Sequence, residues 1–168
     1  MPRDSLGPIA YATARVLHTN GAKNGLMKNL RSIVYASTAT HELTTADLES
    51  LLVDARTFNR NHQVTGVLLH NGFNFMQCLE GAPEDVDKAY RRVKRSSHHK
   101  DIVEYMDGEV AQRSFGSWKM GLAEPAESEL LALSTAEWSK ANQQPSSFES
   151  PIGLTLLKVF WNMRQQTA

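Results

Sequence analysis

The stretch from Gln63 to Gly81, QVTGVLLHNGFNFMQCLEG, has the pattern of a complete β-hairpin, and the rest of the predicted domain is arranged around it. Asn71-Gly72 lies between two apolar runs, and this dipeptide is typical of a two-residue turn in which both central residues take positive φ. Such a turn predicts that His70 and Phe73 close the hairpin. Alternate residues then share one face of the two strands.

The predicted hairpin has one apolar face that contains a single amide, Gln77. The register places Gly66 opposite Gln77, and the flanking pairs on this face are Val64–Leu79 and Leu68–Phe75. Because a buried polar group without a partner costs about 1–3 kcal/mol, Gln77 must find hydrogen bonds. Gly66 would leave room for a flat group against the sheet. Gln77 is therefore either a core amide bonded to nearby backbone or a contact for a bound ring system.

The composition limits the class of protein. The 168 residues suit one domain with attachments, and 18 Lys+Arg against 18 Asp+Glu argue against a nucleic-acid partner or an acidic membrane surface. The apolar runs are shorter than the roughly 20 residues of a membrane span, and the N-terminus lacks the apolar core of a signal peptide. The lone cysteine, Cys78, suits a reducing compartment, so we expect a cytoplasmic protein.

Local signals place the elements before the hairpin. Residues 1–29 show no sustained period and are expected to form a loose extension, and 30–37 read as the first strand. Thr44 begins a helix, with Asp47 in the position of a capping box. The apolar stripe of this helix ends at Asn59, which either caps the helix or presents its amide to whatever the helix covers.

A second helix follows the hairpin. Pro83 marks its first turn, and its apolar stripe stops before His98 and His99, which lack further ligands at metal spacing. Residues 102–111 and 117–122 then read as strands. In the second of these, the side chains expected to share one face are Trp118, Met120 and Leu122.

The order strand, helix, strand, strand, helix, strand, strand predicts an α+β fold, a ferredoxin-like βαββαββ sandwich with both helices on one sheet face. Gln77 should lie on that face. Beyond Ala123 we expect a helix at 127–133, a capping box at Ser134, a linker at 142–150 and a strongly apolar helix after Pro151. These C-terminal helices are expected on the other face, which divides the chain into 1–29, 30–123 and 124–168.

Several motifs, in order, resemble the BLUF family of flavin-binding blue-light sensors. They are N-x(4)-VTGVLL at 59–69, F-x-FMQCLEG at 73–81 and FGSWKM at 115–120. The resemblance runs from about Leu30 to Ala123. It implies FAD, with FMN or riboflavin as alternatives, bound non-covalently between the two helices and against the sheet.

The resemblance also implies roles for individual residues. Tyr35 is similar to the photochemical electron and proton donor, and Gln77 to the amide that links its hydroxyl to the flavin. Trp118 and Met120 are similar to residues tied to signalling. The cofactor-binding set implied in this way is Tyr35, Arg56, Asn59, Gln77, His98, His99 and Met120. The chain departs from the family at Phe58, where a polar residue is usual, and at His98, where an arginine often sits near the phosphates.

The sequence therefore predicts a photoreceptor that is not an enzyme and that signals through the last strand and the C-terminal helices to a partner in trans or to its own oligomer. One alternative is a small ferredoxin-like enzyme of acylphosphatase type, which would need an anion-binding glycine-rich loop that the sequence does not show. The other is a structural interaction module with Tyr35 and Gln77 in its core. A yellow protein whose band shifts reversibly under blue light would separate the first hypothesis from both.

Overall fold

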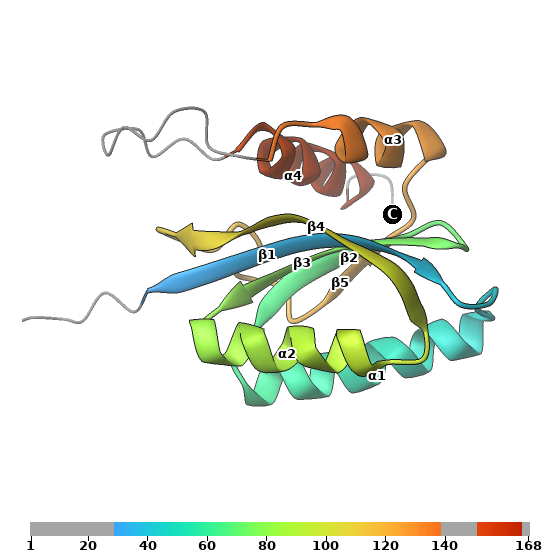
Figure 1. The fold of residues 1–168 in the computed structure, drawn as a ribbon, viewed down its shortest axis with the longest axis horizontal. Helices are drawn as coiled ribbons and strands as arrows, with labels where there is room; N and C mark the ends of the chain where they lie inside the picture. The colour runs from blue at the N-terminus through green and yellow to red at the C-terminus, as the bar shows by residue number, and fades with distance from the viewer. Residues whose placement is uncertain (1–28, 139–150, 166–168) are drawn as a thin grey trace, which may run out of the picture.

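The structure, a computed structural model, describes residues 29–138 and 151–165 and contains a five-stranded sheet between two pairs of helices (Figure 1). The sheet order is β4-β1-β3-β2-β5, with β5 parallel to β2 and the other neighbours antiparallel. Helices α1 and α2 cover one face, called the α1/α2 face, and helices α3 and α4 cover the other, called the α3/α4 face. The elements are β1 (Leu30–Ala39), α1 (Thr45–Asn61), β2 (Thr65–His70), β3 (Asn74–Gly81), α2 (Pro83–Arg95), β4 (His99–Val110), β5 (Gly121–Ala123), α3 (Glu127–Thr135) and α4 (Ile152–Gln165). The predicted α+β, ferredoxin-like architecture is confirmed.

The helices on the α1/α2 face begin where local sequence signals place them. Thr44 Oγ1 accepts the N–H of Asp47 at 3.2 Å, and the Asp47 carboxylate accepts the N–H of Thr44 at 3.0 Å, so the predicted capping box is confirmed. Pro83 opens α2 as predicted. The buried residues packed between these helices and the sheet are Ile33, Tyr35, Ala39, Leu52, Val64, Leu68, Phe75, Leu79, Val86, Ala89, Tyr90 and Met120.

The register predicted for the hairpin is wrong by two residues. His70 pairs with Phe75, and Leu68 pairs with Gln77. Gly72, with φ 98°, takes the first central position of the turn, and Asn71 Oδ1 accepts the N–H of Asn74 at 3.0 Å. The Asn71 side chain thus closes the turn from outside its two central residues. Because a shift of two keeps every side chain on its own face, Gln77 still points toward α1 and α2.

Gly66 has a different purpose from the one predicted. It pairs with Leu79 rather than Gln77, and a Cβ added to it would lie 1.9 Å from the carbonyl oxygen of Cys78. Glycine is needed here because the two backbones of the hairpin approach closely, and it makes no room for a ligand. The strand neighbours of Gln77 are Leu68 on β2 and Tyr35 on β1.

Strand β4 begins at His99, earlier than predicted, and carries two irregularities in its pairing with β1. Val34 pairs with Met106 and Tyr35 with Glu104, which leaves Tyr105 as an extra residue. A second extra residue lies near Asp101, whose φ is 52°. With both bulges, the residues of β4 on the α1/α2 face are His99, Ile102, Glu104, Asp107 and Glu109.

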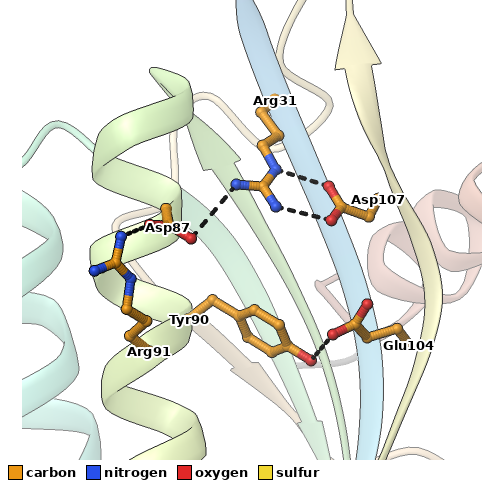
Figure 2. Close-up of polar contacts among 6 residues, drawn as sticks. All are labelled: Arg31, Asp87, Tyr90, Arg91, Glu104 and Asp107. Atoms are coloured by element: carbon orange, nitrogen blue, oxygen red, sulfur yellow. Dashed lines mark hydrogen bonds and ion pairs between the residues drawn. The ribbon is translucent and has the colours of Figure 1, made fainter.

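The acidic residues of β4 hold α2 against the sheet edge, as Figure 2 shows. Arg31 donates to both carboxylate oxygens of Asp107 at 2.7 and 2.8 Å, and its guanidinium lies 3.8 Å from Asp87 on α2. Tyr90 donates from α2 to Glu104 at 2.7 Å. The first bulge makes this arrangement, since it lets Glu104 and Asp107 face the same helix.

The predicted strand at 117–122 is wrong, because β5 is limited to Gly121–Ala123 and residues 117–120 lie outside any strand. Trp118 and Met120 do not share a face. Met120 is buried on the α1/α2 face, whereas Trp118 is 38% exposed and contacts Trp161 of α4. The backbone before β5 is held by donors from α1 and β2 instead of by a strand ladder.

The α3/α4 face is filled by side chains of both C-terminal helices, as predicted. Its fully or nearly fully buried members include Leu133, Leu154, Leu157 and Trp161. The predicted capping box at Ser134 is wrong: Ser134 lies in the last turn of α3, where its hydroxyl donates to Leu131 O at 2.8 Å. The predicted linker and most of the predicted N-terminal extension lie outside the described residues. Within residues 29–138 and 151–165, no helix is long and apolar enough to cross a membrane.

Candidate functional site

A cavity of about 370 Å³ lies between α1, α2 and the sheet. This volume falls in the range of about 300–1,000 Å³ that is typical of small-molecule sites. Polar atoms enter it from Asn59, Gln77 and His99 on three separate elements. The apolar residues of its lining are Leu51, Ala55, Phe58, Leu68, Leu79, Ala89, Val93 and Met120.

Gln77 connects the cavity to a buried tyrosine. Tyr35 lies beside it on β1, is 0% exposed, and donates its hydroxyl hydrogen to Gln77 Oε1. Gln77 Nε2 donates to the sulfur of Met120 at 3.2 Å, which uses one of the two N–H groups of the amide. Burial raises the pKa of Tyr35 well above its usual value, so the phenol stays protonated at neutral pH. The amide predicted to be buried is thus bonded to two side chains and not to nearby backbone.

Two residues of α1 hold the backbone that carries Met120. Asn59 is 3% exposed, lines the cavity, and donates from Nδ2 to the carbonyl oxygen of Lys119 at 2.6 Å. Its side chain therefore joins α1 to the segment before β5 and does not cap the helix. Arg56 lies nearly one turn earlier, is exposed, and donates from Nε to the carbonyl oxygen of Met120 at 3.0 Å. Arg56 is not part of the cavity lining.

The two neighbouring histidines have different surroundings. His99 lines the cavity, where its Nδ1 lies 2.8 Å from Ser37 Oγ and its ring meets Tyr35 edge-on at 6.4 Å. Burial lowers the pKa of His99 to about 4, so the ring is neutral at neutral pH. His98 does not line the cavity; its ring lies 5.8 Å from that of His41, and its buried Nδ1 has no hydrogen-bond partner among the described residues.

Trp118 lies on the opposite side of the sheet from the cavity. Its ring packs edge-on against Trp161 at 5.0 Å, and its carbonyl oxygen accepts the N–H of Gly66 at 2.8 Å. The structure therefore brings together Tyr35, Asn59, Gln77, His99 and Met120. It places Arg56, His98 and Trp118 around them, outside the lining.

Two arginines at the cavity were not singled out from the sequence. Arg92 pairs with Asp54 at 2.5 Å, which joins α2 to α1, and its guanidinium lies 4.4 Å from the centre of the Phe58 ring. Phe58 also stacks on His62, with the two ring centres 4.0 Å apart. Arg95 lies one turn further along α2 and also lines the cavity. The sequence does place Arg92 and Arg95 three residues apart, on the side of α2 that carries the apolar residue Val93, which could have indicated that both face the cavity. Basic residues in the last turn of a helix, however, usually interact with the helix dipole.

The lining fits a flat heteroaromatic ring such as a flavin. Apolar residues from the helices lie opposite Leu68 and Leu79 of the sheet, so a ring between them is covered on both faces. Asn59 Oδ1, the second N–H of Gln77 and His99 Nε2 make no hydrogen bond within the described residues. They offer the ring edge an acceptor, a donor and a ring nitrogen whose role follows the tautomer of His99. The two arginines place positive charge at the end of the cavity where α2 ends.

Comparison with known proteins gives a consistent set of relatives. The family model "Sensors of blue-light using FAD" (BLUF) matches residues 30–121. The blue light- and temperature-regulated antirepressor BluF of Escherichia coli is 33% identical over 93 residues, which are 55% of this chain and 23% of that protein. A photoactivated adenylate cyclase subunit alpha-like protein of Euglena gracilis is 31% identical over 115 residues, 68% of this chain and 11% of its own length. The chain thus spans a quarter or less of these relatives.

Solved structures show the same architecture. The dark-state structure of BlrB, a BLUF protein, is 29% identical with a TM-score of 0.56 and covers 64% of this chain and 80% of its own. The photo-activated state of BlsA is 26% identical with a TM-score of 0.59, covering 80% of this chain and 94% of its own. The second match covers a larger share of the chain than residues 30–121 make up.

Proposed function

Because this chain belongs to the BLUF family of blue-light sensors that use FAD, we propose that Tyr35 and Gln77 are its light-responsive pair and that Met120 receives the change. The observation that carries this proposal is the continuous chain of hydrogen bonds from the Tyr35 hydroxyl through the Gln77 amide to the Met120 sulfur. Asn59 and His99 complete the contacts at the ring edge. We assign Arg56 and His98 to supporting positions, Arg56 acting through the Met120 carbonyl.

The bound flavin supplies absorption of blue light and an electron acceptor. Tyr35 is the buried donor: its phenol keeps its proton in the dark, and loss of an electron would make that proton strongly acidic. Among the described residues, the hydroxyl donates to Gln77 Oε1, through which the proton can leave. Tyr35 also has no solvent contact, which protects a transient radical from side reactions.

Gln77 can record the event without any change in charge. Its amide has an acceptor end, which now faces Tyr35, and a donor end, which now faces Met120. If the two ends exchange places, the oxygen meets a sulfur that has no hydrogen to give, and the bond to Met120 is lost. The carbonyl groups around Met120 then remain tied to α1 while its side chain is released.

The output belongs to the same proposal. We propose that residues 30–123 form the sensor, that residues 124–168 form the output extension, that 1–29 precede the sensor as an extension, and that the chain is not itself an enzyme. A partner in trans or a homo-oligomer would receive the signal, in the cytoplasm, where the unpaired Cys78 suits the reducing conditions. The family match leaves the acylphosphatase-type enzyme and the flavin-free structural module without support.

The absorption spectrum of the FAD-loaded protein, before and after blue light, tests the proposal. We expect a reversible red shift of the flavin band in the wild type and its loss in Tyr35→Phe and in Gln77→Leu. Met76→Leu is the matched control, since Met76 precedes Gln77 on β3 and faces the other side of the sheet. Protein that stays colourless after incubation with FAD, or a Gln77→Leu variant with a normal shift, would overturn the proposal.

A further inference from the structure

Trp161 of α4 lies directly on the backbone that leads from Met120 into β5. It is 2% exposed, and its ring occupies the place where a side chain of residue 121 would be. A Cβ added to Gly121 would lie 2.2 Å from Trp161 Cη2 and 2.5 Å from Cζ2. The ring also meets Trp118 edge-on at 5.0 Å and Phe115 at 6.4 Å. Gly121 is therefore the notch that receives Trp161.

The opposite side of this short segment faces the cavity. Gln77 Nε2 donates to Met120 Sδ at 3.2 Å. Three consecutive carbonyl oxygens accept from the α1/α2 side or from β2: Trp118 O from Gly66, Lys119 O from Asn59, and Met120 O from Arg56. Residues 118–121 thus contact the cavity with one side and α4 with the other.

We propose that Trp161 is the positioning residue through which α4 responds to the state of Met120. The inference rests on the proposed function, which makes the bond between Gln77 and Met120 the element that light changes. Release of the Met120 side chain changes how residues 118–121 pack on the cavity side, and the Trp161 ring responds because it is packed in the notch at Gly121. Packed aromatic contacts rearrange as units and do not deform continuously, so the change passes to α4 as a whole.

The side of α4 that faces away from the sheet carries exposed apolar residues, so a movement of α4 would change the surface of the molecule. Leu154, Leu157 and Trp161 face the sheet, whereas Ile152, Val159 and Met163 are 62%, 46% and 54% exposed. A rotation or release of α4 about its buried side therefore changes an apolar surface at the outside of the molecule.

A second tryptophan on the same face provides a matched control. Trp138 is 6% exposed and covers Gly153 at the start of α4, where an added Cβ would lie 2.3 Å from its Cδ2. Its Nε1 donates to Leu133 O at 2.9 Å, and its ring contacts Tyr105 at 5.8 Å. Trp138 thus packs α4 through a glycine as Trp161 does, but at the opposite end of the helix.

Hydrogen–deuterium exchange of α4 peptides, in the dark and under blue light, tests the inference on the full FAD-loaded chain. Allosteric couplings commonly change an equilibrium by about fivefold or more, so we expect at least that light-induced change in α4 exchange in the wild type. Trp161→Phe should keep the red shift of the flavin band and lose most of the exchange difference. Trp138→Phe should keep both.

A variant of Met120 gives a test that needs no light. Met120→Leu removes the sulfur acceptor at similar size and should raise α4 exchange in the dark, and adding Trp161→Phe should remove this increase. Gly121→Ala, which fills the notch and displaces the Trp161 ring, should uncouple α4 while neither Met120 nor Trp161 is itself substituted. The inference is overturned if α4 exchange does not respond to light in a wild type that shows the red shift, if Trp161→Phe responds normally, or if Trp138→Phe loses the response equally. A wild type without any red shift overturns the proposed function instead, and the inference with it.

Discussion

Gln77 and Glu80 lie three residues apart on β3, both buried, on opposite faces of the sheet. The Glu80 carboxylate accepts the backbone N–H groups of Ser114 and Phe115, each at 2.8 Å, and so uses both oxygens to hold one loop. Gln77 forms hydrogen bonds with two side chains, has a second N–H without a partner among the described residues, and lines a cavity. A buried polar residue is a candidate site residue when its bonding capacity is not exhausted by the fold and empty volume lies beside it.

The same contrast holds for the two faces as wholes. On the α1/α2 face, side chains of Tyr35, Gln77 and Met120 bond to one another beside the cavity. On the α3/α4 face, Trp138 and Trp161 fill the notches at two glycines. Variants on the first face should therefore change what the protein binds and reports, and variants on the second should chiefly change its stability or its output.

The largest effect that we expect from this contrast is a difference between Glu80→Leu and Gln77→Leu in the free energy of unfolding and in the red shift of the flavin band. Glu80→Leu leaves two backbone N–H groups without acceptors and should lower the free energy of unfolding by about 2–5 kcal/mol, with flavin binding and the red shift retained in the folded fraction. Gln77→Leu leaves one phenol unpaired and should cost less, about 1–3 kcal/mol, while removing the red shift. Urea unfolding and light-difference spectra measure the two quantities. Equal loss of the red shift in both variants would remove the contrast.

The second effect concerns pH and sharpens the contrast on the α1/α2 face. Burial lowers the pKa of His99 to about 4, below its unfolded value, so the unfolded chain takes up a proton first as the pH falls. Stability is therefore lost between about pH 6.5 and 4, by roughly 3–4 kcal/mol in total at about 1.4 kcal/mol per pKa unit. Urea midpoints at pH 7 and pH 5 should differ less in His99→Gln than in the wild type. His70, whose pKa burial also lowers, contributes in the same direction in both proteins.

Glu80 on the other face changes the stability with pH in the opposite direction from His99. Burial raises its pKa, so the contribution of the protonated form is lost as the pH rises through the folded-state pKa. A His99→Gln variant that kept the full acid-side loss of the wild type would show that His99 is not the group responsible.

The third effect divides the α1/α2 face into a part that binds and a part that only supports. Tyr90 is 3% exposed, its ring lies 5.2 Å from that of Tyr35, and its hydroxyl donates to Glu104, but it does not line the cavity (Figure 2). Tyr90→Phe should lower the free energy of unfolding by about 1 kcal/mol, because Glu104 is exposed and water can replace the lost donor. The affinity for FAD and the red shift should not change. A tenfold loss of affinity would place Tyr90 within the site.

The smallest effect concerns the end of the cavity where α2 ends. Arg95 lines the cavity there, so Arg95→Gln should weaken FAD binding by about fivefold at most, the value of one exposed charge interaction. Riboflavin, which carries no phosphate, should bind equally well to both proteins. Arg91→Gln is the control, since Arg91 pairs with Asp87 on the outer side of α2. Flavin fluorescence quenching measures the affinity of the wild type and both variants for FAD and for riboflavin. Equal weakening of riboflavin binding in Arg95→Gln would show that Arg95 does not contact a phosphate.

The parts of the fold that depend on local chemistry could be predicted from the sequence. Thr44 with Asp47 and Pro83 each start a helix by contacts within one turn, and both helices begin as predicted. The predicted hairpin had Asn71 and Gly72 as the two central residues of its turn, whereas in the structure Gly72 is the first central residue and Asn71 precedes it. An Asn-Gly pair is compatible with both arrangements, so the sequence alone did not distinguish them. The predicted face of Gln77 is nevertheless correct, because a register shift of two residues leaves every side chain on the same face of the sheet.

The parts that depend on distant contacts could not be predicted. Met120 and Trp118 were expected on one face, but α1 and β2 hold the backbone carbonyls of this segment in a path that no strand period describes. Arg92 and Arg95 resemble ordinary basic residues at a helix end until α1 is placed beside them. The roles given to Tyr35, Asn59 and Gln77 came from the family resemblance and remain predictions that spectroscopy must test.

The two bulges of β4 also determine how this domain can change length. Each adds one residue to β4 and none to β1, so deletion of Tyr105 would join Glu104 directly to Met106, the present partners of Tyr35 and Val34, and both would keep their faces. Deletion of a regularly paired residue such as Gly108 would instead reverse the facing of the residues on one side of it, because side chains alternate along a strand. Single-residue deletions in β4 should therefore be tolerated at Tyr105 more readily than at Gly108, which makes the bulges the places where this strand can change length.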